Sequence, residues 1–364
     1  MRAALLARGA ARAGGVGRLI SGVISGLPGA ARPEDCFLAI TDAPLPEELR
    51  FPALEETVAG TSQPAIFDHF IVPRRARKWG ADVFLATKNS LPPGLPCPSA
   101  CIYLDLAYFA LPSSYPPLDN LYMRAMFRRS ARAARRIIAI SESTRRDVGR
   151  FLSKEAMEKT RVVYPGIDER FRPFDGEELA AARQRFSDLP ERFVLYAGDI
   201  SPRKNLRRLL DAFSGLPREV GLVVTGHRAW KSAHVERALR AAALRREIFL
   251  LGGVPEGDLP ALYNLAEASV YPSLYEGFGF PVLESMACGT PVAASNASSI
   301  PEAAGDAALL FDPHDPGAIR EALSRLLEDP GLRERLSEKG RERASAFTWQ
   351  RCAGMILELL REIV

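Results

Sequence analysis

Short apolar runs alternate with amphipathic segments along the whole chain. In the segments 206–213 and 319–327, large aliphatic and aromatic residues recur at spacings of three and four, which places them on one face of a helix. The intervening runs have the length and continuous hydrophobicity of buried strands. We expect strands at 3–6, 36–40, 83–86, 100–104, 136–140, 161–164, 193–197, 221–225, 248–251, 268–271, 291–294 and 308–311. Apolar strands that alternate with helices predict parallel sheets covered on both faces.

The alternation is interrupted near the middle of the chain. Turn residues at 164–168 follow a strand, and a polar segment at 169–192 leads to the next one. A chain of 364 residues is also too long for one ordinary core. We therefore expect an α/β protein with two Rossmann-like, doubly wound parallel-sheet domains at 1–170 and 171–345. The apolar stripe of a last helix, at 346–364, could pack on either domain.

Composition narrows the class of protein. Apolar residues at 47% and charged residues at 25% are typical of a soluble globular protein, and no stretch has the roughly 18 continuous apolar residues of a membrane-spanning helix. Five scattered cysteines complete no zinc-type spacing, which favours reduced thiols and a cytoplasmic enzyme. The first 33 residues are rich in arginine and lack acids, as in a transit peptide, but we interpret them as a strand, a glycine turn and a helix of the mature protein.

Charge is distributed unevenly. Residues 1–172 carry 25 Lys and Arg against 17 Asp and Glu, a net charge of +8, whereas the remainder carries 23 against 27, or −4. Six arginines at 124–136 form a basic ridge, which is most simply a solvated helix face. The alternative is peripheral contact with anionic membrane at its inner face. Aromatic residues are not interleaved with the arginines as in a nucleic-acid binder, so we expect no nucleic-acid partner.

The segment 275–284 (YEGFGFPVLE) places two carboxylates around a glycine-rich turn. Gly277 and Gly279 lack a Cβ and let the backbone approach a ligand, and the amides of a helix that begins after them favour a phosphate. Glu284, inside that helix, could accept hydrogen bonds from a ribose diol. By itself, the pattern is equally typical of a tight turn with an acidic residue near a helix start.

A second segment changes that balance. The strand at 193–197 ends at Gly198, and Arg203 and Lys204 follow just before an amphipathic helix. Strand ends of open α/β sheets face the ligand crevice, and a guanidinium next to an ammonium suits a diphosphate. A basic pair alone would be an ordinary surface feature. Followed about 75 residues later by the acidic glycine turn, it indicates one nucleotide site built at neighbouring strand ends.

These segments resemble family 4 of the retaining glycosyltransferases, the group 1 glycosyltransferases, and in particular its mannosyltransferase-like members. The stretch 196–206 (YAGDISPRKNL) is similar to the family's donor-phosphate loop, and 272–292 is similar to its Glu-to-Glu signature. The stretches 15–18 and 129–145 resemble first-domain motifs of the family. The resemblance extends over essentially the whole chain. It implies the GT-B fold, in which two Rossmann-like domains face a central cleft.

The resemblance also implies roles for individual residues. The first domain would bind the acceptor, with Gly15, Gly17 and Asp105 on the acceptor side, and the second would bind a nucleotide-sugar donor such as GDP-mannose. The last helix would cross back onto the first domain. Arg203, Lys204 and Glu276 would be the catalytic residues. The implied donor-binding set comprises Gly198, Arg203, Lys204, Val254, Glu276, Gly277, Phe278, Gly279, Val282, Leu283 and Glu284.

Two departures from the family pattern concern the chemistry. Leu104 stands before Asp105 where many members have histidine, and Asp199 stands where some have arginine. The first changes the acceptor side, and the second leaves phosphate binding to Arg203 and Lys204. The chain has no Asp-x-Asp pair and its four histidines show no ligand spacing, so we expect neither a metal nor another cofactor. Same-face attack, with the leaving phosphate taking the acceptor's proton, is favoured over double displacement, which stays open.

Other functions fit less well. A sugar-nucleotide epimerase or phosphorylase of the same fold would act on the donor without an added acceptor. A non-catalytic sugar-nucleotide-binding subunit is disfavoured by the retention of both glutamates and both cations, although Leu104 leaves it open. A NAD-dependent dehydrogenase is disfavoured because the glycine turn at 14–17 lacks the third glycine of the dinucleotide fingerprint. The segment 226–230 follows a strand and could border the cleft, with Trp230 more simply a packing residue.

Overall fold

The computed structural model describes residues 1–10, 14–61, 63–228, 233–243 and 248–364, which form two compact units. Unit 1 comprises Met1–Ala110, Pro117–Gly166 and Phe347–Val364. Unit 2 comprises Leu111–Pro116 and Ile167–Ala346. The main division therefore falls between Gly166 and Ile167, and the chain returns to unit 1 after Ala346. The expected Trp230 lies outside the described residues.

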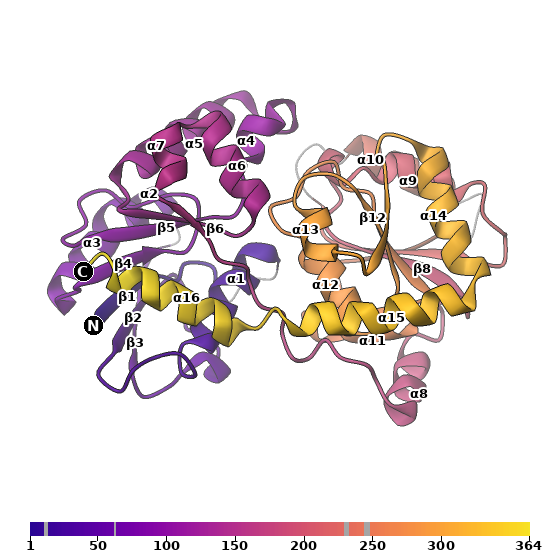
Figure 1. The fold of residues 1–364 in the computed structure, drawn as a ribbon, viewed down its shortest axis with the longest axis horizontal. Helices are drawn as coiled ribbons and strands as arrows, with labels where there is room; N and C mark the ends of the chain where they lie inside the picture. The colour runs from indigo at the N-terminus through magenta and orange to yellow at the C-terminus, as the bar shows by residue number, and fades with distance from the viewer. Residues whose placement is uncertain (11–13, 62, 229–232, 244–247) are drawn as a thin grey trace. The chain divides into compact units, whose positions relative to one another are not determined.

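Unit 1 contains a parallel sheet in the order β3-β2-β1-β4-β5-β6-β7 (Figure 1). Its strands are β1 Arg2–Leu6, β2 Cys36–Thr41, β3 Leu54–Val58, β4 Val83–Ala86, β5 Ser99–Tyr103, β6 Arg136–Ala139 and β7 Thr160–Val162. The helices are α1 Gly15–Gly26, α2 Pro64–Ile66, α3 Val72–Trp79, α4 Ala107–Ala110, α5 Pro117–Ala133, α6 Glu142–Phe151, α7 Lys154–Glu158 and α16 Trp349–Arg361, with a 3-10 turn at Glu47–Leu49 and a π-helix at Phe67–Ile71. Apolar side chains bury both faces of the sheet, as parallel sheets require.

Unit 2 contains a parallel sheet in the order β10-β9-β8-β11-β12-β13. Its strands are β8 Phe193–Ala197, β9 Gly221–Thr225, β10 Ile248–Gly252, β11 Ala268–Tyr271, β12 Val292–Ser295 and β13 Ala308–Phe311. The helices are α8 Gly176–Arg185, α9 Leu206–Phe213, α10 Ala233–Ala243, α11 Leu259–Leu265, α12 Phe280–Ala287, α13 Ile300–Ala304, α14 Pro316–Glu328 and α15 Pro330–Ser345. Short 3-10 turns lie at Pro112–Ser114, Pro202–Lys204 and Glu256–Asp258.

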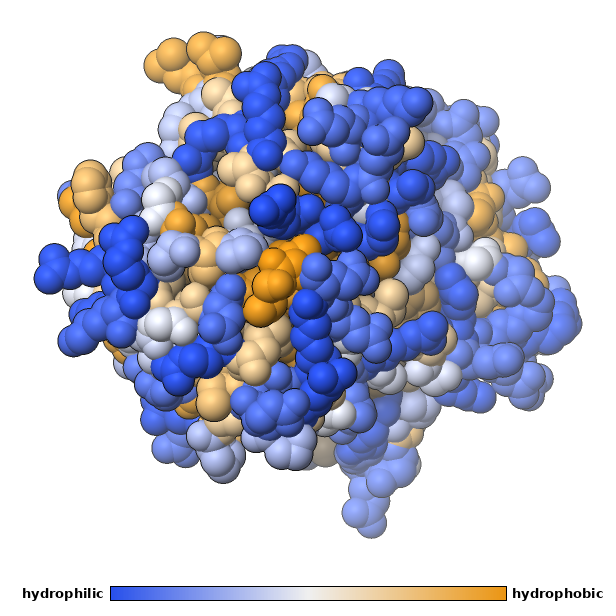
Figure 2. Space-filling model, turned by 60° about the vertical axis from the view of Figure 1, so that its left-hand side comes forward, coloured by the Kyte–Doolittle hydropathy of each residue, from blue (hydrophilic) through white to orange (hydrophobic). Residues whose placement is uncertain are grey.

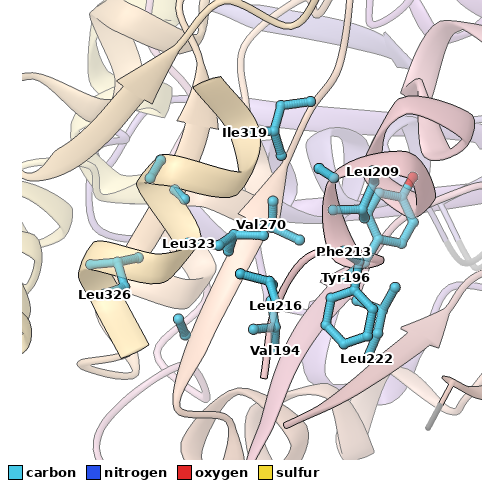
Figure 3. Packing of buried hydrophobic residues seen from close by; sticks show 14 of the residues in the cluster. Val194, Tyr196, Leu209, Phe213, Leu216, Leu222, Val270, Ile319, Leu323 and Leu326 are labelled. Carbon is cyan, nitrogen blue, oxygen red and sulfur yellow. The ribbon is translucent and has the colours of Figure 1, made fainter. Parts of the chain in front are cut away.

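The core of unit 2 follows from the helical spacing seen in the sequence. Ile319, Leu323 and Leu326 lie on one face of α14 and point toward strand residues such as Val194 and Val270 (Figure 3). Leu209 and Phe213 of α9 join the same buried cluster. Burying these side chains contributes roughly 1.5–3 kcal/mol each, which fixes α9 and α14 on the sheet. The strand ends that these helices follow are held in place as a result.

The last helix belongs to unit 1, where α16 packs on α1. Two glycines of α1 make the contact close: a Cβ added at Gly22 would lie 2.0 Å from the ring of Trp349, and one at Gly26 would lie 2.2 Å from the Trp349 carbonyl oxygen. A Cβ added at Gly166 would likewise lie 2.2 Å from the backbone nitrogen of Trp349. Glycine is required at these positions because the neighbouring atoms are a half-buried ring and backbone.

The expected fold class, two parallel-sheet Rossmann-like domains, is confirmed. Each expected strand is present, with shifts of one or two residues at several ends; the strand expected at 161–164 is Thr160–Val162. Strand β3 was not expected from the sequence, because Glu55, Glu56 and Thr57 interrupt its apolar pattern. It lies at the edge of the sheet and pairs with β2, so polar side chains are tolerated there.

On the face shown in Figure 2, hydrophilic residues predominate and hydrophobic ones occur in small separate groups. Within the part of the chain that the structure describes, no helix combines the length and the hydrophobicity that crossing a bilayer requires.

Candidate functional site

The strand order of unit 2 indicates where a ligand would bind. From β8 the chain builds β9 and β10 on one side of the sheet and β11, β12 and β13 on the other. The order therefore reverses between β8 and β11, and ligands of open α/β sheets bind outside the carboxyl ends of the strands at such a switch point. The loops that follow β8 and β11 carry the basic segment 198–205 and the acidic glycine turn 272–279. The switch point thus brings together the two segments that the sequence analysis singled out.

The basic loop is fixed by its own turn and by the neighbouring strand ends. Pro202–Lys204 forms a 3-10 turn, and Asn205 follows in the left-handed region with φ 59°. The side-chain amide of Asn205 (Nδ2) donates to the carbonyl oxygens of Pro272 at 2.9 Å and Pro313 at 2.7 Å, so the loops after β11 and β13 both hold this residue. The buried Tyr196 hydroxyl donates to the Asp199 carbonyl oxygen at 3.0 Å. Arg203 and Lys204 are therefore held on ordered backbone.

Glu276 lies between the two cations. Its Oε2 accepts from Arg203 Nη1 at 2.8 Å, and its Oε1 accepts from Lys204 Nζ at 2.6 Å. The side chains of Arg203, Lys204 and Glu276 are 20%, 10% and 13% exposed. Burial by itself would raise the pKa of Glu276, but the charges of Arg203 and Lys204 and the hydrogen bond from Lys204 lower that pKa to about 2. The three groups form a largely desolvated, ionised cluster with a net charge of +1.

Two serines after β12 hold the backbone of Glu276. The Ser298 hydroxyl donates to the Glu276 carbonyl oxygen at 2.5 Å and accepts from the Glu276 amide at 3.2 Å. The Ser299 hydroxyl lies 2.9 Å from the same carbonyl oxygen. Ser298 has φ 58°, an unfavourable backbone conformation of the kind found at ligand sites. The sequence analysis missed both residues; a serine pair directly after a strand of this sheet was the available signal.

The glycine turn leads into α12 without a side-chain cap. Gly279 has φ 122°, in the region that favours glycine, and Phe280 begins the helix. Phe278, Val282 and Leu283 are buried, and they fix the turn from the inside. Gly277 is buried as well. Backbone near the start of α12 can therefore approach a ligand at the switch point, where the helix dipole favours negative charge.

Glu284 is a buried carboxylate on α12, 2% exposed. Its Oε2 accepts from the Tyr263 hydroxyl at 3.2 Å, and the hydroxyls of Tyr263 and Tyr271 lie 2.9 Å apart. Sequence reasoning did not single out these tyrosines, because buried aromatic residues next to strands are usually core. The Tyr263 hydroxyl thus gives this buried carboxylate a hydrogen-bond donor, as burial of a charged group requires.

Close backbone approach also shapes the β8, β9 and β10 strand ends. A Cβ added at Gly226 would lie 1.9 Å from the Gly198 carbonyl oxygen, and one at Gly253 would lie 2.0 Å from the His227 ring. The Ile200 amide donates to the His227 carbonyl oxygen at 2.8 Å, which ties the basic loop to the loop after β9. Val254, expected near the nucleotide base, is half-buried against the core beneath the loop after β10.

The residues expected on the acceptor side lie at the carboxyl ends of strands in unit 1. Gly15 and Gly17 begin α1 after β1, with Gly14 at φ 103° before them. Asp105 follows β5, and its Oδ1 caps the Ala107 amide at 2.9 Å. The Leu104 amide donates to Asn89 Oδ1 at 2.7 Å. β1 and β5 both neighbour β4, so these segments lie close together at the carboxyl ends of the central strands. They belong to unit 1, whereas Arg203 and Glu276 belong to unit 2.

Two Rossmann-like units, the second with cations and carboxylates at its switch point, define the GT-B class of proteins. The family model described as Glycosyltransferase Family 4 matches residues 13–171, and the one described as Glycosyl transferases group 1 matches residues 180–343. The chain belongs to this glycosyltransferase family. The expected family is confirmed.

Individual relatives and structures agree with the family. The chain is 35% identical over 258 residues, 68% of its length, to O-antigen chain mannosyltransferase B of Escherichia coli and covers 66% of that protein. It is 32% identical over 277 residues, 72% of its length, to the serotype-specific mannosyltransferase WbdA of Escherichia coli but covers 33% of it. The chain therefore spans about two thirds of the first protein and a third of the second. The structure of Anabaena Alr3699/HepE in complex with UDP-glucose is similar over 100% of both chains, with a TM-score of 0.78 and 19% identity.

Proposed function

We propose that this glycosyltransferase moves a hexose, with retention of anomeric configuration, from a nucleoside-diphosphate sugar to an acceptor hydroxyl in glycan, polysaccharide or glycolipid biosynthesis. GDP-mannose is the proposed donor and mannose the transferred sugar, which the relatives named as mannosyltransferases support. The observation that carries the proposal is the cluster of Arg203, Lys204 and Glu276 at the switch point of unit 2. Unit 2 would bind the donor, and unit 1 would bind the acceptor.

The proposed chemistry follows from charge. When the bond between the sugar and the diphosphate breaks, negative charge develops on the leaving phosphate. Arg203, Lys204 and the amides at the start of α12 would stabilise that charge without rearranging during the step. Glu276 would accept hydrogen bonds from hydroxyls of the transferred sugar, and Glu284 from the ribose. Because Glu276 is assigned to hydroxyls of the transferred sugar and not to its anomeric carbon, same-face attack is a better proposal than a carboxylate nucleophile.

Transfer should not require a metal ion, because fixed cations neutralise the leaving diphosphate. In the described ranges, no three His, Cys, Asp or Glu side chains are grouped so that they could hold a metal ion. We expect full transfer from GDP-mannose to an oligomannose acceptor in excess EDTA, and a product with the donor's anomeric configuration by proton NMR. Loss of transfer in EDTA with rescue by magnesium or manganese would contradict the metal-free step. If the donor is consumed equally fast with and without acceptor, an epimerase or phosphorylase would be favoured. If the donor binds but is not turned over, a non-catalytic subunit would be favoured.

The protein is also proposed to contact anionic membrane at the cytoplasmic face, where a lipid-linked acceptor would lie. Helix α5 exposes Leu118, Leu121 and Tyr122 by 81%, 70% and 53%. Arg128 and Arg132, further along α5, and Arg135 just beyond its end are exposed. The other arginines of the ridge are partly engaged: Arg129 bonds the Leu91 carbonyl oxygen, and Arg136 pairs with Glu362. Exposed apolar and basic side chains on one helix are typical of a membrane-surface contact.

We expect co-sedimentation with vesicles that contain anionic phospholipid, and none with neutral vesicles. Each cation near the surface contributes about 1 kcal/mol at most, and salt should reverse the binding. Replacing Arg128, Arg132 and Arg135 by glutamine should abolish it. Replacing Arg74, Arg75 and Arg77 of α3, which are also exposed, removes the same charge and should reduce it little. If both triple variants behave alike, net charge and not the α5 surface determines binding.

A further inference from the structure

The arrangement of the ionised cluster implies that Glu276 and a bound diphosphate compete for Arg203 and Lys204. Each oxygen of the Glu276 carboxylate bonds one cation, at 2.8 Å to Arg203 and 2.6 Å to Lys204. A diphosphate that binds the same two cations would bring two or more anionic oxygens to the positions that the carboxylate oxygens hold. Guanidinium and ammonium groups bind carboxylate and phosphate oxygens through the same charge-assisted hydrogen bonds. Glu276 and a diphosphate are therefore alternative partners for one pair of cations.

We propose that Glu276 makes the site discriminate between a nucleoside diphosphate that carries a sugar and one that does not. This inference rests on the proposed donor function of unit 2. A free nucleoside diphosphate must displace the carboxylate from its cations, or bind beside it, and leaves it without new partners. A nucleoside-diphosphate sugar also displaces it, but the sugar's hydroxyls then donate hydrogen bonds to the carboxylate. The same side chain thus opposes binding of the product and favours binding of the donor.

Two features of the cluster make this competition effective. The side chains are largely buried, so solvent screens the repulsion between the carboxylate and a diphosphate only partly. The backbone of Glu276 is fixed by the hydroxyls of Ser298 and Ser299, at 2.5 and 2.9 Å from its carbonyl oxygen. The carboxylate can therefore change partners by side-chain rotation alone, and it stays within reach of the site when it does.

Glu276 is charged at neutral pH. Burial would raise its pKa, but the charges of Arg203 and Lys204 lower it to about 2. Protonation therefore does not remove the competition under physiological conditions. The functional consequence is weak retention of the nucleoside diphosphate after transfer, which limits product inhibition.

The test compares E276Q with the wild type by calorimetry, using GDP and GDP-mannose, with UDP and UDP-glucose in parallel. Glutamine keeps the size of the side chain and removes the charge. We expect E276Q to bind the free nucleoside diphosphate about tenfold more tightly and the sugar nucleotide no more tightly than wild type. The preference for the sugar nucleotide should fall accordingly. D199N is the matched control: Asp199 is an exposed carboxylate of the loop that carries Arg203 and Lys204, and its loss should change both affinities by about twofold or less.

The outcomes separate this inference from the proposed function. If wild type binds none of the four nucleotides, both are overturned. If wild type binds them and E276Q binds the free nucleoside diphosphate as tightly as wild type or more weakly, the proposed competition is overturned and the proposed donor site stands. Thermal unfolding gives a second measurement: E276Q should be less stable alone, and the diphosphate should raise its Tm more than that of wild type. If E276Q does not fold, E276D keeps the charge but shortens the side chain, and it should bind the free diphosphate a few-fold more tightly; unchanged binding would overturn the inference.

Discussion

Replacing Arg203 and Lys204 together by glutamine should lower kcat/KM for sugar transfer on the order of 10⁴-fold. Each side chain would stabilise the charge of the leaving diphosphate from a site that is largely closed to solvent, and removal of one such group typically lowers the rate 10²–10³-fold. The combined effect should be smaller than the product of the single effects, because both cations bind the same group. Steady-state transfer from GDP-mannose measures it.

Two controls separate catalysis from folding. The double variant leaves Glu276 buried without its cations, which can destabilise unit 2. A triple variant with E276Q removes the unpaired carboxylate charge and should have the same low activity with a higher Tm. R218Q removes an exposed cation of unit 2 and should keep wild-type kcat/KM. Activity of the double variant within tenfold of wild type would show that the diphosphate binds elsewhere.

Replacing Gly26 by alanine should lower the free energy of unfolding of unit 1 by about 3 kcal/mol. A Cβ at this position would lie 2.2 Å from the Trp349 carbonyl oxygen and 2.5 Å from its carbonyl carbon. Backbone cannot move aside as a flexible side chain can, so α16 must shift away from α1, and overpacking of this kind typically destabilises by 1–3 kcal/mol. Chemical denaturation followed by tryptophan fluorescence measures the change.

Gly15 of the same helix is the matched control. A Cβ there meets no heavy atom within 4 Å, and alanine is a better helix former than glycine. Gly15→Ala should therefore leave unit 1 equally stable or stabilise it by up to about 1 kcal/mol. Equal effects of the two substitutions would mean that α16 does not depend on the close contact at Gly26.

The fold class could be predicted because most strands are buried on both faces. Strands β4, β8, β9 and β11 are buried throughout and have the bounds expected from the sequence. β3 could not be found in this way. It has one neighbouring strand, and all its side chains are half-buried or exposed, so acidic residues are accepted. The edge strands β10 and β13 keep an apolar sequence and were expected, whereas β3 carries Glu55, Glu56 and Thr57 and so leaves little apolar pattern.

The site could be predicted only in part. Arg203, Lys204, Glu276 and Glu284 were recognisable because a basic strand-end loop and an acidic glycine turn occur together, in the order that one nucleotide site requires. That Glu276 pairs with both cations was not predictable, since 72 and 73 residues separate the partners and the contact depends on the strand order. Ser298, Ser299 and Tyr263 were missed for another reason. Serines in turns and tyrosines in cores are common, and only their hydroxyl partners distinguish these three.

The return of the chain to unit 1 at Phe347 constrains how such enzymes can diversify by recombination. A single crossover between Gly166 and Ile167 would join the first unit of one parent to the last helix of another, against glycines in α1 that fit one particular Trp349. Exchange of unit 2 therefore needs two breakpoints, the second near Ala346, so that α1 and α16 stay together. Chimaeras made with both breakpoints should fold more often than those made with one, and α1 and α16 should be inherited as a pair.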